Sequence, residues 1–251
     1  MKTKKGLALV VALVVFIGFS VYFLFVSRPA PFPAHEEILA QLNQLLPEVA
    51  VDEIQDVVYV APRHVFVPFK TKKNDYGMSY WTWRGKWKMD VKNSIGAPRL
   101  WMINEKDPAS YHFVWNIHPD DDVNMIDLYL IRHRYYSMTY TTKTDQTEHR
   151  YEPGIQLKEQ VSLETKSYGV LPLSDDWVTV MRMLDQMEAP KPSVFDSFFQ
   201  RDDLYFGWRA FDETGDESKN LHRSINGSSF VNRNVDQLVR YLNPSDLGLI
   251  E

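Results

Sequence analysis

Histidines and aspartates gather around one turn in the middle of the chain. His112 and His118 share a parity in an extended segment, and Asp120 follows them closely. Because alternate side chains of a strand point to the same side, both imidazoles would face one way. Imidazole with carboxylate suits a zinc site or acid–base chemistry, and His133 on the next extended segment would face this group. The pattern leaves open a hydrolytic site at His112, His118 and Asp120, or the solvated end of a turn.

A second acidic loop carries oxygen ligands at alternate positions, Asp212, Thr214, Asp216 and Ser218. Such spacing is suitable for Ca²⁺. The loop departs from the twelve-residue calcium loop, because its glycine stands at the fourth position and no glutamate ends it. Asp212 and Asp216 are therefore candidate metal ligands, with a charged surface turn as the alternative. The same two interpretations apply to the aspartates at 120–122.

A row of tryptophans, Trp81, Trp83 and Trp87, falls on one parity of an alternating segment. An exposed row would stack on sugars or lipid headgroups, but such rows more often form the core face of a sheet, and we expect core. The basic residues of the other parity would bind an anionic polymer or form a solvated face: Arg84, Lys86 and Lys88.

Basic and aromatic residues also interleave over 132–140, where Arg132, His133 and Arg134 precede three tyrosines, Tyr135, Tyr136 and Tyr140. This mixture superficially suggests single-stranded nucleic acid. The acidic balance of the chain, −5 overall, argues against that partner. We expect cross-strand packing instead, and no nucleic-acid partner.

Motifs for common catalysis are missing from the sequence. With no cysteine there is no thiol nucleophile and no cysteine metal site. The phosphate-binding, dinucleotide-binding, serine-hydrolase and zinc-protease motifs are also absent. The sequence thus predicts no cofactor and favours no catalytic residue.

The N-terminal region indicates a membrane anchor. The 22 residues from Gly6 to Ser27 carry no charge. As a helix they would span roughly 33 Å, enough for a hydrocarbon core of ~30 Å. A cleaved signal peptide is the alternative, but its apolar run is normally ~7–15 residues. We expect an uncleaved single-pass transmembrane signal-anchor over 6–27.

Charge at the two ends of this run predicts its orientation. Lys2, Lys4 and Lys5 precede it and only Arg28 follows closely, and positive charge prefers the cytoplasmic side. Residues 1–5 would then be cytoplasmic, and residues 28–251 would lie outside the cell membrane. The outer part carries 25 basic and 33 acidic residues, a balance of −8. An exported chain without cysteine fits a bacterial envelope.

Outside the anchor, the chain predicts an α+β fold with a mainly antiparallel sheet and about three flanking helices. Prolines alternate over 28–33, typical of an extended spacer that lifts the domain off the bilayer. Helices are expected over 34–46, 175–188 and 235–242.

Strands fill the region between the helices. They include the alternating segment 79–91, which is a hairpin if Arg84 to Lys86 turns, as well as 155–163 and 204–211. Another hairpin is expected, with arms 110–117 and 125–140, the second of which must bend, bulge or break. We expect one extracytoplasmic domain over 34–251, with a boundary near 170–174 as the alternative.

These features favour a non-enzymatic binding or scaffold protein of the bacterial envelope. Recognition would use the aromatic sheet face or the turn at 118–124, and the partner would be an envelope protein, a cell-wall component or a small ligand. The alternative is an envelope hydrolase that acts on glycans or phosphate esters through the histidine–aspartate group.

Overall fold

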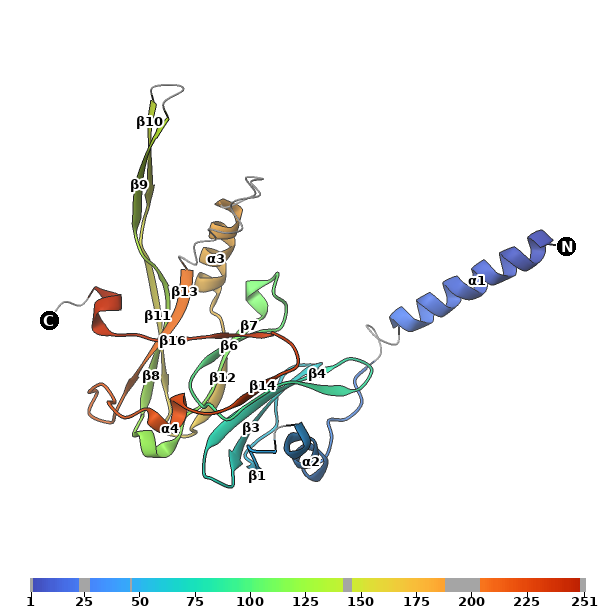
Figure 1. Cartoon of the computed structure of the whole chain (residues 1–251), viewed down its shortest axis with the longest axis horizontal. Helices are drawn as coiled ribbons and strands as arrows, with labels where there is room; N and C mark the ends of the chain where they lie inside the picture. Colours follow the sequence, from blue (N-terminus) through green and yellow to red (C-terminus); the bar gives the residue numbers. More distant parts are fainter. Residues whose placement is uncertain (1, 23–27, 46, 142–145, 188–203, 249–251) are drawn as a thin grey trace. The chain divides into compact units, whose positions relative to one another are not determined.

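The computed structural model describes residues 2–22, 28–45, 47–141, 146–187 and 204–248 (Figure 1). Over these residues the chain is mixed α+β, with four α-helices and mostly antiparallel sheets. It divides into two compact units: unit 1 is Met1–Ser94 with Ser228–Asn234, and unit 2 is Ile95–Gly227 with Val235–Glu251. Neither unit begins or ends near 170–174. A single domain over 34–251 stays a prediction.

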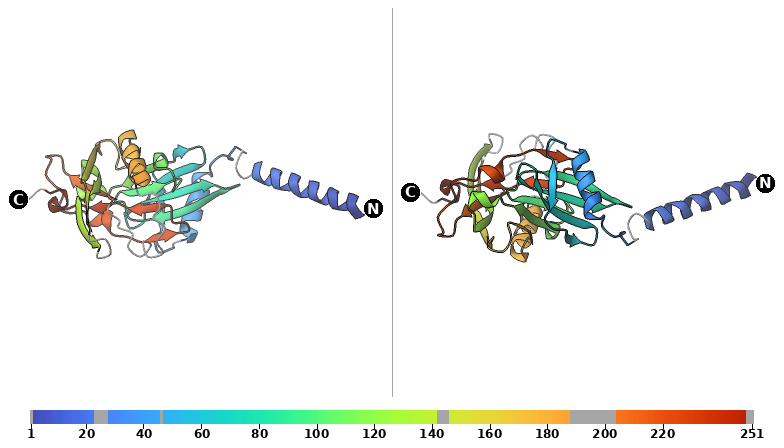
Figure 2. Two further views of the ribbon diagram at one scale, coloured as in Figure 1. Left: turned by 90° about the horizontal axis from the view of Figure 1, so that it is seen from above. Right: turned by 90° about the horizontal axis from the view of Figure 1, so that it is seen from below.

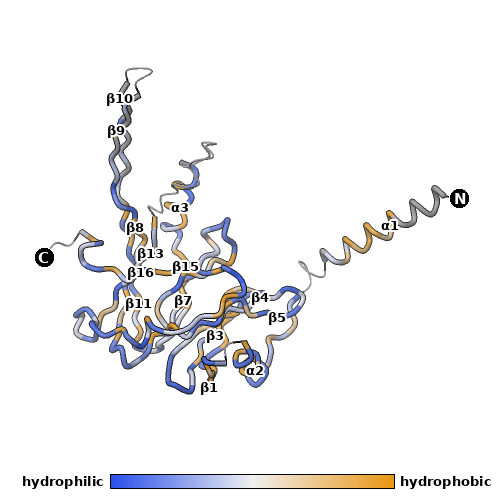
Figure 3. The backbone as a smooth tube through the Cα atoms, viewed as in Figure 1, coloured by the Kyte–Doolittle hydropathy of each residue, from blue (hydrophilic) through white to orange (hydrophobic). Residues whose placement is uncertain are grey.

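Helix α1, Lys2–Val21, contains most of the uncharged run. Its described large apolar side chains from Val10 to Phe19 are each more than half exposed, and they contribute to the hydrophobic stretch visible in Figure 3. Within the described residues, no helix combines the length and the apolar character needed to cross a membrane.

Unit 1 is built on a six-stranded antiparallel sheet with the order β1-β3-β4-β5-β14, in which β2 also pairs with β3. The strands are β1 Val51–Ile54, β2 Val58–Ala61, β3 His64–Thr71, β4 Tyr76–Trp83, β5 Trp87–Asn93 and β14 Ser229–Val231. Gly85 turns β4 into β5 with φ 75°, a left-handed conformation that glycine adopts without steric cost. The segment 79–91 is therefore a hairpin.

Helix α2, His35–Leu45, lies along the sheet of unit 1 (Figure 2). Ile38 and Leu42, one helical turn apart, are fully buried. They join a core cluster with the odd-numbered residues of three strands: Val65, Val67, Phe69, Trp81, Trp83, Trp87 and Met89. The shared parity explains this core, since alternate side chains meet on one face.

The proline-rich segment 28–33 is in contact with unit 1. Phe32 packs edge-on against Trp81 and Trp87, with ring centroids 5.5 and 4.9 Å away. The Trp87 indole N–H donates to the Ala30 carbonyl at 2.9 Å. The segment thus contributes to the aromatic core instead of standing clear of it, as a free spacer would.

Unit 2 contains two four-stranded sheets. One has the order β12-β7-β6-β15 and the other β11-β8-β13-β16. The first comprises β6 Arg99–Met102, β7 Tyr111–Asn116, β12 Tyr168–Pro172 and β15 Asp236–Leu238. The second comprises β8 Met125–Arg132, β11 Ile155–Ser162, β13 Leu204–Phe211 and β16 Arg240–Tyr241. The β13–β16 pair is parallel.

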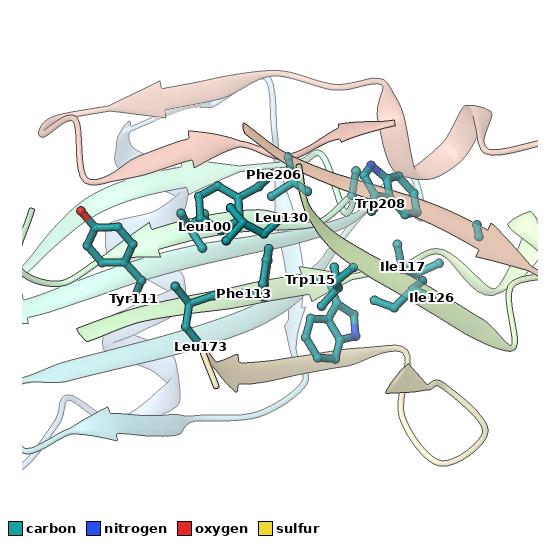
Figure 4. Packing of buried hydrophobic residues seen from close by; sticks show 14 of the residues in the cluster. Leu100, Tyr111, Phe113, Trp115, Ile117, Ile126, Leu130, Leu173, Phe206 and Trp208 are labelled. Carbon is teal, nitrogen blue, oxygen red and sulfur yellow. The ribbon is translucent and has the colours of Figure 1, made fainter. Parts of the chain in front are cut away.

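The core of unit 2 lies between these sheets (Figure 4). Phe113 of β7 packs edge-on against Phe206 of β13, with ring centroids 5.7 Å apart. It also meets Trp177 of helix α3, Asp175–Met187, at 5.6 Å. Phe113 is fully buried, and Trp177 and Phe206 are nearly so. Aromatic packing of this kind fixes the two sheets face to face.

A two-stranded ribbon extends from unit 2. Strands β9, Tyr135–Thr141, and β10, Gln146–Glu152, pair with each other and continue β8 and β11 past the sheet (Figure 1). The long segment 125–140 therefore breaks into two strands. Short helices complete the unit: α4 His222–Ile225 and the 3₁₀ turns Pro108–Ser110, Pro119–Asp121 and Pro244–Leu247.

Two predicted elements are wrong. Segments 110–117 and 125–140 contain strands, but β7 and β8 belong to different sheets and form no hairpin. The residues between β7 and β8 connect one four-stranded sheet of unit 2 to the other. The segment 235–242 forms β15 and β16 instead of a helix, and Leu238 of its apolar stripe is 58% exposed. Pairing with β6 and β13 overrides the local helical period.

Candidate functional site

Two acidic turns meet at one pocket of unit 2, with a volume of about 390 Å³. We call it the acidic pocket. Its lining is Asp120, Asp121, Asp122, Asp212, Asp216, Glu217, Ser218, Lys219 and Asn220. The pairing of β13 with β8 explains the meeting, because it sets Phe211 at the end of one strand opposite Met125 at the start of the other.

The first wall is the 3₁₀ turn Pro119–Asp121. His118 caps it, and its Nδ1 accepts the Asp120 N–H at 3.0 Å. The buried Asp121 carboxylate accepts the backbone N–H groups of Arg223 and Ser224, at 3.1 and 2.8 Å, at the start of α4. Asp121 therefore holds the turn in place. Asp120 and Asp122, on either side of it in the chain, are exposed.

The second wall is the loop after β13. One Asp212 carboxylate oxygen accepts the Thr214 hydroxyl at 2.7 Å, the Thr214 N–H at 2.9 Å and the Asp216 N–H at 3.0 Å. The hydrogen bond from the Thr214 hydroxyl is the main reason that the pKa of Asp212 lies below its usual value. Gly215 takes φ 85° at the turn. Asp212 therefore stays ionised at neutral pH, and Asp216 is exposed.

Glu217 links the second wall to strands β13 and β16. Burial alone would raise its pKa, but hydrogen bonds from Arg209 at 2.7 Å and from the Tyr241 hydroxyl at 2.8 Å lower it below the usual value. The Ser218 hydroxyl donates to the Asp122 carbonyl at 3.0 Å and links the two walls. The pocket is therefore braced at Asp121, Asp212 and Glu217.

Chemically, the pocket concentrates negative charge against a single lysine, Lys219. No group of three histidine, aspartate or glutamate side chains in the described ranges is placed to hold a metal ion. One Asp212 carboxylate oxygen already accepts three hydrogen bonds from the loop itself. The arrangement suits a diffuse cationic group, such as an ammonium or guanidinium, better than a dehydrated ion.

The predicted histidine group does not assemble around one point. His118 is fully buried, and its Nδ1 lies 3.7 Å from an Asp120 carboxylate oxygen. His112 stands six residues earlier on the same extended segment, about 20 Å away at ~3.3 Å per residue. Its Nδ1 is 2.9 Å from the Ser110 carbonyl oxygen, and burial lowers its pKa. His133 instead contacts the Tyr205 hydroxyl at 2.8 Å.

The aromatic row is core, as predicted. Trp81, Trp83 and Trp87 are all at least nine-tenths buried, so they offer no stacking surface. On the other parity, Arg84 forms an ion pair with the buried Asp90, whereas Lys86 and Lys88 are exposed.

In segment 132–140, Tyr136 packs across the strands as expected, with its ring centroid 6.2 Å from that of His149, but the tyrosines are not buried. Tyr136 and Tyr140 are each 58% exposed. Both acidic turns are recognisable from their residues, but their meeting is not predicted by the sequence. The turns are about ninety residues apart in the chain, and only the β8–β13 pairing brings them together.

Comparison of the chain with protein-family models, curated proteins and solved structures finds no match.

Proposed function

We propose that this chain is a single-pass membrane protein of the bacterial envelope, and that its region outside the membrane binds a cationic group of a partner in the acidic pocket. The partner would be an envelope protein or a cell-wall component that carries ammonium or guanidinium groups. The single observation that carries the proposal is the meeting of Asp120, Asp122, Asp212 and Asp216 at one braced pocket.

The membrane part is supported by the sequence. The run from Gly6 to Ser27 is uncharged, and three lysines precede it. Most of it lies in a helix, and the apolar side chains described from Val10 onward are more than half exposed. Moving such side chains from water into lipid is favourable. The N-terminus would lie in the cytoplasm and residues 28–251 outside the membrane.

The binding part is supported by the fixed geometry of the pocket. Asp212 and Glu217 are held by hydrogen bonds that favour their ionised forms. A pocket whose walls are already in place loses little conformational entropy on binding. We do not extend the proposal to hydrolysis, because His112 lies far from His118 and Asp120 along the strand.

Membrane fractionation of the full chain tests the anchor. We expect the chain to stay in the membrane pellet after alkaline carbonate washing, with a mass that includes the N-terminus. A mature chain that begins near residue 30 would contradict it.

Binding of a fluorescent oligolysine peptide to residues 28–251 tests the pocket. We expect binding that weakens as salt rises, since exposed charges are screened. Asp120→Asn with Asp216→Asn should weaken it at least fivefold at low salt. The control is Glu105→Gln with Asp185→Asn, which removes the same charge from exposed positions near Tyr111, at the other end of β7 from the pocket. Equal losses in the two double variants would show that only net charge matters, and would overturn the pocket.

A further inference from the structure

One face of the β9–β10 ribbon presents large apolar side chains to solvent. Tyr136, Met138 and Tyr140 alternate along β9 and are 58, 61 and 58% exposed, and Tyr151 of β10 is 65% exposed. The register sets Tyr136 opposite Tyr151 and Met138 opposite His149. These side chains therefore share one face, which we call the tyrosine face: Tyr136, Met138, Tyr140, Thr147, His149 and Tyr151.

The large side chains of the tyrosine face are more than half exposed, and one contact crosses the face. The Tyr136 hydroxyl lies 2.8 Å from His149 Nδ1 across the strands, which fixes both rings. None of the six residues belongs to a core cluster among the described residues. Within the same residues, β9 and β10 pair only with each other. A two-stranded ribbon is marginally stable in water by itself, so covering this face would stabilise it.

We propose that the tyrosine face binds the tyrosine face of a second copy of this chain. The Met138–His149 pair lies at the centre of the face. The Tyr136–Tyr151 pair lies on one side of it and the Tyr140–Thr147 pair on the other. A twofold axis that runs across the ribbon at this centre sets Met138 against Met138 of the other copy. It also sets the Tyr136–Tyr151 end against the Tyr140 end. Both copies then use the same face, as in a twofold interface.

The chemistry and area of the face fit a second copy. None of its six residues is an aspartate, glutamate, lysine or arginine, so two copies bring no such like charges together. Tyrosine and methionine are enriched at protein interfaces. Three tyrosines and a methionine at these exposures offer roughly 500 Å² per copy. Complete burial of this area in a pair would remove about 1,000 Å² from solvent, which is the lower limit for a specific interface.

Such a small interface needs a high local concentration. Two chains anchored in one membrane meet at an effective concentration far above that in solution. For this concentration we rely on the membrane anchor proposed above. The dimer does not depend on the acidic pocket, which lies at the opposite end of β8, next to Met125.

Cysteine crosslinking in the full chain tests the dimer cleanly, because the chain contains no cysteine. Met138→Cys sets a thiol at the centre of the tyrosine face. The matched control is Met183→Cys on α3, since Met183 is 57% exposed and Met138 is 61% exposed. Both variants are reconstituted in phosphatidylcholine vesicles and oxidised. We expect at least tenfold more disulfide-linked dimer from Met138→Cys than from Met183→Cys.

A second variant tests whether the tyrosines hold the dimer. Adding Tyr136→Ser and Tyr140→Ser to Met138→Cys should lower the dimer yield at least tenfold, with an unchanged circular dichroism spectrum. Equal crosslinking of the two single variants would indicate random collision and overturn the dimer. A Met138→Cys chain that reacts fully with a water-soluble maleimide but forms no dimer would also overturn it. A Met138→Cys chain that neither reacts with the maleimide nor forms a dimer would overturn it as well, because its tyrosine face is then covered by lipid or by its own chain.

Different results would refute the proposed anchor and the proposed dimer. Loss of the full chain from the membrane pellet would refute the anchor. The same crosslinking, repeated on that chain in solution, would then decide the dimer separately.

Discussion

At the scale of single residues, Lys92 is the most unusual group in unit 1. Its side chain is fully buried in β5, and its ammonium donates to the carbonyls of Leu42 at 2.8 Å and Val49 at 2.7 Å. Leu42 lies in the last turn of α2, where carbonyls lack helical partners and favour a cation. Lys92 thus joins the helix to the sheet, although burial lowers its pKa to about 8.

This lowered pKa predicts how stability depends on pH. Between pH 8 and 10.5 the unfolded chain binds more protons at Lys92 than the folded chain does, so the free energy of unfolding rises with pH. The rise from pH 7 to 9.5 should be about 2 kcal/mol. Urea unfolding of residues 28–251 measures it, and Lys92→Met should abolish the rise. Lys88→Met, at an exposed position of the same strand, should keep it.

At higher pH the direction reverses. Burial raises the pKa of Tyr129 to about 12 and also raises the pKa of Tyr241. Above pH 10 the folded chain therefore retains protons that the unfolded chain loses, and the free energy of unfolding falls. A flat profile for the unaltered chain between pH 7 and 9.5 would contradict the role given to Lys92.

At the scale of elements, the segment 28–33 belongs to unit 1. Phe32 fills the space between Trp81 and Trp87, and its ring also meets Tyr59 edge-on at 6.3 Å. Removing a partly buried aromatic ring costs less than the 3–5 kcal/mol of a fully buried one. The segment therefore stabilises the sheet as well as connecting it to α1.

Phe32→Ala should lower the free energy of unfolding by about 1–3 kcal/mol. Urea unfolding followed by tryptophan fluorescence measures the loss. Pro31→Ala, at an exposed neighbouring position, should change the stability by less than about 0.5 kcal/mol. Similar values for the two variants would mean that Phe32 contributes no packing energy.

Local sequence patterns predicted the helices and strands better than they predicted which strands pair with each other. The strand at Leu204–Phe211 and the helix from Asp175 follow from alternation and from an apolar stripe with acidic residues in the first turn. The tryptophan parity correctly predicted the core of unit 1. The separation of β7 and β8 into two sheets depends on strand pairing distant in sequence, which periodicity does not encode.

The candidate site was predictable only in part for the same reason. Both acidic turns stand out as runs of carboxylates, and each was identified from its residues. Their meeting depends on the register of β8 with β13. The exposure of Tyr136 and Tyr140 could not be read from alternation, because a half-buried strand and an uncovered ribbon have the same period.

At the scale of the whole molecule, the C-terminal part of the chain completes the N-terminal unit. Strand β14 adds to the edge of β5, and Phe230 pairs with Lys92. The Ser94 N–H donates to the Ser228 carbonyl, and the Asn232 N–H donates to the Asp90 carbonyl, at 2.9 and 2.8 Å. Because hydrogen-bonded pairs alternate in an antiparallel ladder, the Phe230 N–H faces β5 and the Val231 N–H faces away.

Proline substitutions in β14 should therefore differ. Phe230→Pro removes a ladder donor, and a lost backbone hydrogen bond costs about 1 kcal/mol or more. We expect amide hydrogen exchange in β5 to speed up about tenfold. Val231→Pro should leave it nearly unchanged, since its N–H faces away from the ladder. Equal acceleration by both prolines would show that β14 does not protect the edge.

The return of β14 to unit 1 also has a consequence for biosynthesis. The edge of β5 is translated about 140 residues before its partner strand. At ~5–20 residues per second, the nascent first sheet would wait roughly 10–30 seconds with that edge open. An exposed strand edge invites pairing with other chains. A chaperone that shields this edge until nearly the whole chain has emerged would therefore limit such pairing.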